Sequence, residues 1–187
     1  MGRCVSGFAK SDIRAALLAA RRSAPVEVRA RADAAICQEL ASLVPRQPAD
    51  PVAAYRPLRT EPGGSALLPT LAGRRVLLPV LCDDRDLDWA ESDGPLLGRS
   101  AIAGAGLVIV PAVAVDRGGV RLGRGGGSYD RALARVPANV LVVALLYDGE
   151  LVDELPAEPH DRRVSAVITP TFGLVNLPTD AGRTGAV

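Results

Sequence analysis

The sequence predicts an α/β domain with three layers, in which a central, mainly parallel sheet is flanked by helices. Two short runs carry Val, Leu and Ile without alternation, GLVIV at 106–110 and VLVVALL at 140–146. Continuous apolar runs are typical of strands buried on both faces, as in a parallel sheet covered by helices. Candidate helices alternate with the strands, which is the pattern of layered α/β domains. The 187 residues fit a single domain, 1–187, and we expect an ordered core over about 8–175.

Two helices are expected at the start of the chain, at 10–22 and 26–44, with Pro25 between them. Ser11 is a candidate N-cap of the first helix. The apolar residues of both helices recur at helical spacing, at Ile13, Leu17 and Leu18 in the first and at Ile36, Leu40 and Leu43 in the second. A stiff loop follows, because prolines stand at positions 45, 48 and 51.

The rest of the chain predicts strands joined by short helices. The expected strands lie at 52–55, 75–81, 106–110, 140–146 and 164–169. The expected helices lie at 65–71, 99–105 and 128–136. The tail from Asn176 is rich in Pro, Gly and Thr, so we expect it to fray.

Charge balance and cysteine usage exclude several classes of protein. Lys and Arg number 22 and Asp and Glu 21, for a net charge of +1, whereas nucleic-acid-binding proteins carry a clear basic excess. Cys4, Cys37 and Cys82 lie far apart without CxxC spacing, so neither a disulfide framework nor a zinc site is expected. Reduced thiols, and the lack of a targeting segment or an apolar span, predict a cytoplasmic protein without nucleic-acid or membrane partners. We expect a monomer.

The stretch RLGRGGGSYDR, residues 121–131, follows a buried strand and opens a predicted helix. Its glycines let the backbone take positive φ and approach a ligand closely, because no Cβ stands in the way. Successive N–H groups in such a loop can point at an anion, and the flanking arginines can neutralise phosphate charge. Ligands of layered α/β sheets bind beyond the carboxyl ends of the strands. These features favour a phosphate cradle, with a flexible surface turn as the alternative.

The loop follows neither of the common nucleotide motifs. No Lys follows the glycines, so it is not a Walker A loop, and Ser128 stands where a Rossmann fingerprint has its third glycine.

Asp130, which follows the glycines closely, has two interpretations. A carboxylate beside phosphates can hold Mg²⁺ together with phosphate oxygens. At the start of a helix it can instead stabilise the helix dipole.

Five blocks resemble the 5-formyltetrahydrofolate cyclo-ligase family, and they follow one another along the chain in the same order as in that family. The central block is LVIVPAVAVDRGGVRLGRGGGSYDR at 107–131, whose strand-Pro and Asp-x-x-Gly elements precede the glycine loop. The others are KSDIRAALLAARRS at 10–23, YRPLRTE at 55–61, VLLPVL at 76–81 and PAEPHDRRVSAVIT at 156–169. The resemblance covers most of the chain from Lys10 to Thr169. It implies that ATP and Mg²⁺ are used to convert 5-formyltetrahydrofolate to 5,10-methenyltetrahydrofolate, with release of ADP and phosphate.

The resemblance also implies which residues bind ATP. Lys10 and Arg14, one helical turn apart, resemble the ATP-binding pair of the opening helix, whereas their spacing alone fits an ordinary solvated face. Arg124 is implied as the catalytic residue, aimed at the transferring phosphoryl group. The residues that resemble the phosphate cradle are Arg121, Leu122, Gly123, Arg124, Gly125, Gly126, Gly127, Ser128 and Tyr129.

Four further positions resemble the folate and metal sites of the family. Glu61 and Tyr129 are implied as folate-binding residues, and Asp130 and Asp161 as Mg²⁺ ligands. Without the resemblance, Glu61 reads as a loop carboxylate. Asp161, which follows the sole histidine, reads as part of a surface loop.

Two departures from the family pattern lie on the folate side. Ser128 replaces an aromatic residue, and the segment from Trp89 to Ala101 lacks a Gly-hydrophobic-x-Glu-Pro element. They keep open an alternative, a nucleotide-binding regulatory relative with weakened folate binding and little turnover. A sugar-phosphate isomerase or CoA-transferase on a similar fold is a third candidate. Glu61 would be its base, but Lys10 and Arg14 would have no role.

Overall fold

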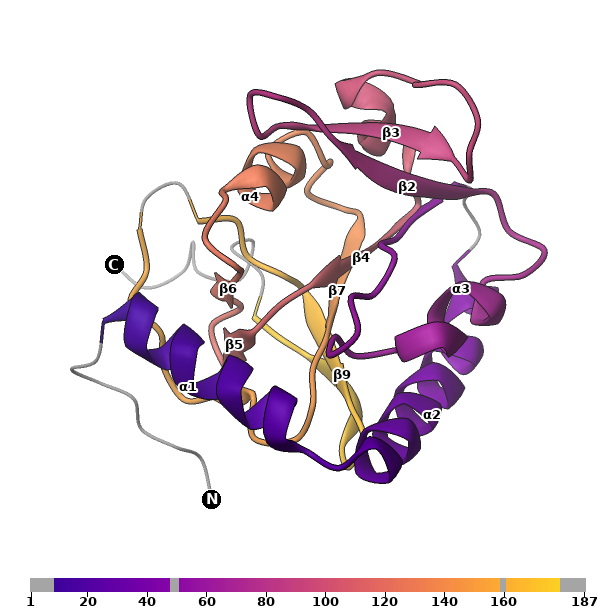
Figure 1. Ribbon diagram of the computed structural model, residues 1–187. Helices are drawn as coiled ribbons and strands as arrows, with labels where there is room; N and C mark the ends of the chain where they lie inside the picture. Colours follow the sequence, from indigo (N-terminus) through magenta and orange to yellow (C-terminus); the bar gives the residue numbers. More distant parts are fainter. Residues whose placement is uncertain (1–8, 48–50, 159–160, 179–187) are drawn as a thin grey trace.

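A seven-stranded sheet and a smaller sheet of three strands organise the chain (Figure 1). The computed structural model describes residues 9–47, 51–158 and 161–178. In spatial order, the strands of the large sheet are β10 (Gly173–Asn176), β9 (Ala166–Thr169), β7 (Leu141–Leu145), β4 (Leu107–Pro111), β1 (Val52–Ala53), β2 (Val76–Leu81) and β3 (Leu87–Glu91). The five inner strands are parallel, and the edge strands β10 and β3 pair antiparallel to their neighbours. The sheet is therefore mainly parallel, as predicted.

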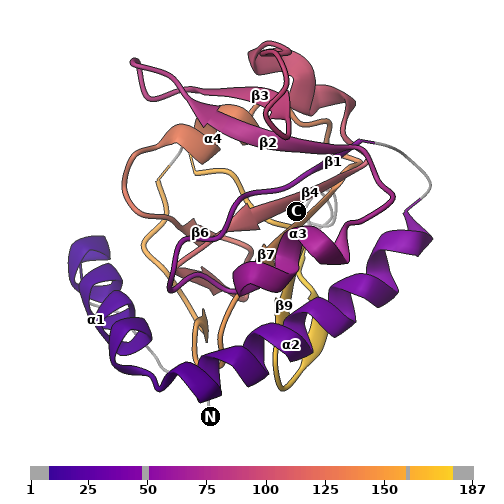
Figure 2. The same ribbon diagram turned by 45° about the vertical axis from the view of Figure 1, so that its right-hand side comes forward.

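Helices cover both faces of this sheet, so the predicted three-layer α/β fold is confirmed (Figure 2). On one face lie α2 (Val26–Leu43) and α3 (Leu67–Thr70), and on the other lie α4 (Ser128–Leu133) and the 3₁₀ helix η3 (Arg99–Gly104). The connection from β1 to β2 through α3 and the connection from β4 to β7 through α4 run in opposite directions across the sheet. Right-handed crossovers in opposite directions place their helices on opposite faces, as observed.

The first helix, α1 (Lys10–Ser23), packs on the small sheet and not on the large one. That sheet consists of β6 (Arg121–Leu122), β5 (Ala114–Asp116) and β8 (Leu151–Val152). Ile13 is buried there, and Leu17 and Leu18 pack against the same apolar cluster, so the predicted apolar face of the helix is confirmed. The small sheet joins the carboxyl end of β4 to the glycine loop, because β5 and β6 lie between them in the chain.

Several local expectations differ from the structure. Ala9, and not Ser11, is the N-cap of α1, and no side chain caps it. The expected helix at 65–71 begins as a 3₁₀ turn, η2 (Gly64–Ala66), and the expected proline loop after α2 opens with another, η1 (Val44–Arg46). Asn176, where the tail was expected to begin fraying, pairs with Ala166 in β10, and residues 179–187 lie outside the described residues.

The second helix, α2, buries the apolar face predicted from its spacing, whereas Val26 and Val28 in its first turn are exposed. Within α2, Ile36, Leu40 and Leu43 are buried, as their spacing predicts. Among the residues that the structure describes, we find no helix of sufficient length and hydropathy to cross a membrane.

Candidate active site

A cavity of about 620 Å³ lies beyond the carboxyl ends of β1, β2 and β4. Tyr55, Leu81 and Pro111, at or just past these strand ends, form part of its wall. In the sheet, β2 lies on one side of β1 and β4 on the other. The cavity therefore lies where the order of the strands reverses. This is where ligands bind in open α/β sheets.

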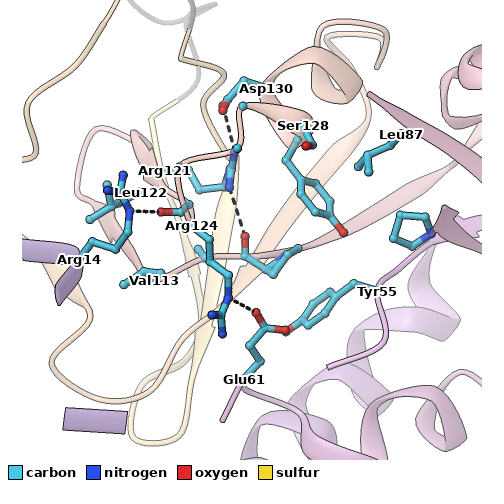
Figure 3. Close-up of a pocket in the computed structure, with 18 of the residues that line it drawn as sticks. Arg14, Tyr55, Glu61, Leu87, Val113, Arg121, Leu122, Arg124, Ser128 and Asp130 are labelled. Carbon is cyan, nitrogen blue, oxygen red and sulfur yellow. Dashed lines mark hydrogen bonds and ion pairs between the residues drawn. The ribbon is translucent and has the colours of Figure 1, made fainter. Parts of the chain in front are cut away.

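Every residue that the sequence analysis assigned to the site lines this one cavity. Figure 3 labels several of them, among them Arg14, Glu61 and Arg124. The assigned residues come from α1, from the loop after β1, from β6 and the glycine loop with the start of α4, and from the segment before β9. They are Lys10, Arg14, Glu61, Arg121, Leu122, Gly123, Arg124, Gly125, Gly126, Gly127, Ser128, Tyr129, Asp130 and Asp161.

The glycine loop, residues 123–127, has its carbonyl oxygens held by arginines. Arg14 Nε donates to the carbonyl of Gly123 at 2.7 Å, and Arg131 Nη2 donates to that of Gly126 at 3.3 Å. Gly125 has φ +98° and Gly127 has φ +68°, conformations that other residues adopt only with strain. Among the described residues, the amide N–H groups of 124–127 have no hydrogen-bond acceptor. This arrangement favours the anion cradle over the surface turn, because the free amides border a cavity.

Arg121 and Asp130 tie the two ends of the loop together. Arg121 Nη2 donates to Asp130 Oδ1 at 2.9 Å, and Nη1 donates to the carbonyl of Pro111 at 3.3 Å. The Arg121 guanidinium also lies 5.6 Å from the centre of the Tyr129 ring, a cation–π distance. Its buried Nε has no acceptor within the described part of the chain. Arg121 thus has a compensated charge and a structural role at the base of the loop.

The segment before the loop is a turn held by one buried carboxylate. Asp116 accepts hydrogen bonds from the amides of Gly118, Val120 and Leu155. These bonds close the hairpin between β5 and β6 and tie it to the residues that follow β8. The Asp-x-x-Gly element of the sequence therefore fixes the start of the glycine loop.

Lys10 is held at the edge of the cavity by two carboxylates. Its Nζ lies 2.8 Å from Asp161 Oδ2 and 3.1 Å from Glu158 Oε1. Partial burial lowers the pKa of Lys10, but the hydrogen bonds to Asp161 and Glu158 outweigh this and leave the pKa raised. Lys10 is therefore a stable ammonium group at neutral pH, on the same side of the cavity as Arg14.

Arg124 and Glu61 form an ion pair that joins the glycine loop to the loop after β1 (Figure 3). Arg124 Nε donates to Glu61 Oε1 at 2.8 Å, and Glu61 Oε2 accepts the amide of Leu58 at 2.9 Å. The Glu61 carboxylate is 7% exposed, whereas the Arg124 side chain is 44% exposed. The terminal nitrogens of Arg124 have no acceptor among the described residues, so they are available to a ligand.

The opposite side of the cavity is apolar, and most of its residues were not predicted. Tyr55 is buried and its hydroxyl donates to the carbonyl of Pro62 at 2.8 Å; burial raises its pKa well above the usual range. Burial likewise raises the pKa of Tyr129, so its hydroxyl stays neutral. The other apolar residues of this side are Leu58, Pro79, Leu81 and Leu87. The rule that ligands bind at strand ends could have indicated Tyr55, Pro79 and Leu81.

The segment between Trp89 and Ala101, where the sequence departs from the family pattern, contributes nothing to the wall. The apolar residues Pro79, Leu81 and Leu87 of this side come from β2 and β3 instead. Ser128, the second departure, does line the cavity.

The carboxylates expected to bind Mg²⁺ both face the cavity, and each contacts a cation of the protein. Asp130 Oδ1 pairs with Arg121, and Asp161 Oδ2 pairs with Lys10. Over residues 9–47, 51–158 and 161–178, no cluster of three or more His, Cys, Asp or Glu side chains could hold a metal ion. The neighbouring His160 lies outside the described residues. The metal-ligand assignment stays a prediction.

Comparisons with known proteins point to one family. The model of the 5-formyltetrahydrofolate cyclo-ligase family matches residues 7–170. A 5-formyltetrahydrofolate cyclo-ligase of Mycolicibacterium smegmatis is 42% identical over 195 residues, which cover 92% of this chain and 100% of that protein. Its counterpart in Escherichia coli (strain K12) is 42% identical over 66 residues, 35% of this chain and 36% of that protein.

Two solved structures share the fold. A 5,10-methenyltetrahydrofolate synthetase from Mycoplasma pneumoniae has a TM-score of 0.76 at 22% identity, covering 87% of this chain and 99% of that one. A 5,10-methenyltetrahydrofolate synthetase from Aquifex aeolicus has a TM-score of 0.76 at 24% identity, covering 96% of each chain. These two likenesses show the fold. The family model and the relative of 42% identity, which match most of the chain, establish that it belongs to the 5-formyltetrahydrofolate cyclo-ligase family.

Proposed function

We propose that this protein uses ATP to convert 5-formyltetrahydrofolate to 5,10-methenyltetrahydrofolate, with release of ADP and phosphate. The observation that carries the proposal is the two-sided cavity. One side presents Lys10, Arg14 and free backbone amides, which suit a polyphosphate, and the other presents an apolar wall with the buried carboxylate of Glu61. Arg124 lies between the two sides and binds Glu61.

The chemistry requires that the two substrates meet. The oxygen of an N-formyl group is a poor leaving group until it carries the γ-phosphoryl group of ATP. N10 of the folate then attacks the formyl carbon and loses its proton, and the carbon–oxygen bond breaks to release phosphate. Such a transfer depends mainly on positioning and charge neutralisation. It requires no covalent intermediate on the protein.

Each group of residues has a part in this reaction. Lys10, Arg14 and the amides of the glycine loop bind the polyphosphate. The terminal nitrogens of Arg124 donate to the phosphoryl group as it is transferred. Hydrogen-bond donors that are already in place where charge develops usually stabilise a transition state more than any other single effect. Glu61 accepts hydrogen bonds from N–H groups of the folate, and Tyr129 lines the folate side.

Asp130 and Asp161 would hold Mg²⁺. The residues fit this ion, because Mg²⁺ commonly takes one or two carboxylates together with substrate phosphates and waters and needs no larger protein cage. Both carboxylates line the cavity on the side of the proposed phosphate-binding residues, and Asp130 has a second oxygen besides the one that pairs with Arg121. The ion would neutralise charge on the ATP phosphates.

Turnover of purified protein tests the proposal. With ATP, Mg²⁺ and 5-formyltetrahydrofolate, the absorbance of 5,10-methenyltetrahydrofolate should grow, and ADP should form only when the folate is present. ATP binding by calorimetry without any product at high enzyme concentration would support the regulatory alternative instead. The apolar residues of the cavity favour the enzyme over that alternative, because they offer a surface for the folate. No observation favours an isomerase or CoA-transferase.

The location and oligomeric state belong to the proposal as well. A cytoplasmic monomer is expected. Cys37 and Cys82, the two cysteines within the described residues, are free thiols, which suits a reducing compartment.

A further inference from the structure

A polar cluster lies behind Glu61, outside the cavity. The hydroxyl of Tyr147 lies 2.9 Å from Asp33 Oδ1 and 3.3 Å from the carbonyl oxygen of Glu61. The amide of Gly63 donates to the same Asp33 oxygen at 2.9 Å. A hydroxyl has one proton, so the shorter contact, with the carboxylate, is the hydrogen bond that dominates. Neither Tyr147 nor Asp33 lines the cavity.

The two glycines behind Glu61 lie close against Asp33 and Leu67. Gly63 and Gly64 have φ +90° and +48°, in the region that favours glycine. A Cβ added to Gly64 would lie 2.6 Å from Asp33 Oδ2, and one added to Gly63 would lie 3.0 Å from Leu67 Cβ. The turn that follows Glu61 is thus shaped to fit against the Asp33 carboxylate.

Tyr147 also connects this turn to α1. Its ring lies 5.5 Å from the Arg21 guanidinium, and its amide donates to Glu150 Oε2 at 2.7 Å. Both oxygens of Glu150 accept from Arg21 at 2.7 Å, and Arg21 Nη2 donates to the carbonyl of Ala112 in the cavity wall. A continuous set of buried and half-buried contacts therefore runs from the cation-bearing helix to the loop that carries Glu61.

We propose that Tyr147 and Asp33 are positioning residues, which hold Glu61 where it meets both the folate and Arg124. This inference rests on the proposed function of the site. Glu61 also has local contacts, because its carboxylate binds Leu58 and Arg124, its amide donates to the Leu58 carbonyl and its carbonyl accepts the Gly64 amide. Tyr147 and Asp33 add the contacts that tie this turn to α2 and to the residues after β7.

The charge states suit this role. Burial raises the pKa of Tyr147, so the hydroxyl is a neutral donor at pH 7. Burial also raises the pKa of Asp33, while the hydrogen bonds from Tyr147 and Gly63 lower it. A neutral hydroxyl that donates to a carboxylate is a charge-assisted bond, which is stronger than a bond between neutral groups. Loss of this hydrogen bond should therefore loosen the turn that follows Glu61.

The test compares Tyr147→Phe, which removes only the hydroxyl, with Asp33→Ala and Asp33→Asn. We expect the KM for 5-formyltetrahydrofolate to rise about fivefold in Tyr147→Phe and Asp33→Ala, while the KM for ATP changes less than about twofold. Asp33→Asn keeps an acceptor oxygen and should restore most of the affinity. The double variant Tyr147→Phe/Asp33→Ala should be little worse than either single change, because the two residues act as a unit.

Ser165→Ala is the matched control. It removes one hydroxyl at the amino end of the sheet, where Ser165 Oγ accepts the amide of Val142 at 3.3 Å. Both KM values should stay unchanged in this variant. Hydrogen exchange adds a measurement that does not depend on activity. Amides of residues 55–66 should exchange faster in Tyr147→Phe than in the unsubstituted protein, and those of β4 and β7 should not.

The outcomes separate this inference from the proposed function. If the unsubstituted protein turns over and Tyr147→Phe leaves the folate KM unchanged, or raises both KM values equally, the positioning role is wrong. If the unsubstituted protein does not turn over, the proposed function fails. The exchange rates of 55–66 then decide alone whether Tyr147 holds the turn, and unchanged rates would overturn that claim.

Discussion

Arg124 of the glycine loop binds Glu61 of the loop after β1, with 2.8 Å between Nε and Oε1. The pair places a side chain of the proposed phosphate-binding side against a side chain of the proposed folate side. Arg124 uses Nε on Glu61, and its terminal nitrogens have no acceptor among the described residues, which suits the proposed contact with the phosphoryl group. The contact between these two residues therefore marks the point in the cavity where the two substrates would meet.

Replacing Arg124 tests this assignment. In Arg124→Ala we expect kcat to fall by about 10²-fold, the usual effect of removing one donor to developing charge, while ATP affinity changes little. Arg117→Ala is the control, since Arg117 is 63% exposed and pairs with Asp153 at the surface. Steady-state kinetics and ATP calorimetry give both quantities. Equal losses in turnover and in ATP affinity would contradict the role.

Replacing Asp130 tests the metal assignment. In Asp130→Asn we expect the Mg²⁺ concentration for half-maximal activity to rise about tenfold, because a charged ligand becomes a neutral one. A loss of stability should accompany it, since Arg121, which is 3% exposed, loses its charged partner. Asp153→Asn, which changes a surface pair, is the control for general effects of charge. Wild-type activity of Asp130→Asn at ordinary Mg²⁺ would refute the assignment.

The buried pair of Arg21 and Glu150 predicts a non-additive effect on stability. Their side chains are 2% and 5% exposed, so Glu150→Leu leaves a buried cation without its partner. We expect this change to lower the free energy of unfolding by about 3–5 kcal/mol. The double variant Arg21→Met/Glu150→Leu should lose less than the single change. Urea unfolding of Glu150→Leu, Arg21→Met and the double variant measures these losses. A double variant whose loss equals the sum of the two single losses would argue against a coupled pair.

Asp86 predicts a pH dependence of stability. The hydrogen bond from Arg135 holds the pKa of Asp86 below its ordinary value, although burial opposes this. A carboxyl whose pKa is lowered on folding contributes stability above its ordinary pKa, about 4, and loses it as the pH falls through the lowered value. The urea midpoint should thus fall less steeply below about pH 4 in Asp86→Asn than in the unsubstituted protein. The fully exposed Asp93 gives the control Asp93→Asn, whose slope should match that of the unsubstituted protein.

The fold class and the position of the glycine loop could be predicted from local sequence. The runs at 106–110 and 140–146 form the centre of the sheet, β4 and β7, because fully buried strands need no alternation. The strands β5, β6 and β8 were missed as separate elements, since two or three residues carry no periodicity. β3 was not predicted, because charged residues surround it in the sequence. Leu87 and Trp89, which alternate with Asp88, could have indicated it.

The candidate residues could be assigned from the family pattern, but their partners could not. Arg124 and Glu61 are 63 positions apart, and Lys10 and Asp161 are 151 positions apart. Such pairs depend on how the strands and α1 assemble, so local spacing holds no information about them. The structural role of Arg121 was missed for the same reason, because its burial follows from the packing of β6 against β5.

The fate of the formyl oxygen is the measurement that tests the proposed reaction most directly. The purified protein would be given ATP, Mg²⁺ and 5-formyltetrahydrofolate labelled with ¹⁸O in the formyl group. Transfer of the phosphoryl group to that oxygen predicts one ¹⁸O atom in the released phosphate for each molecule of 5,10-methenyltetrahydrofolate. Unlabelled phosphate, or no methenyl product at an enzyme concentration equal to that of the substrate, would contradict it.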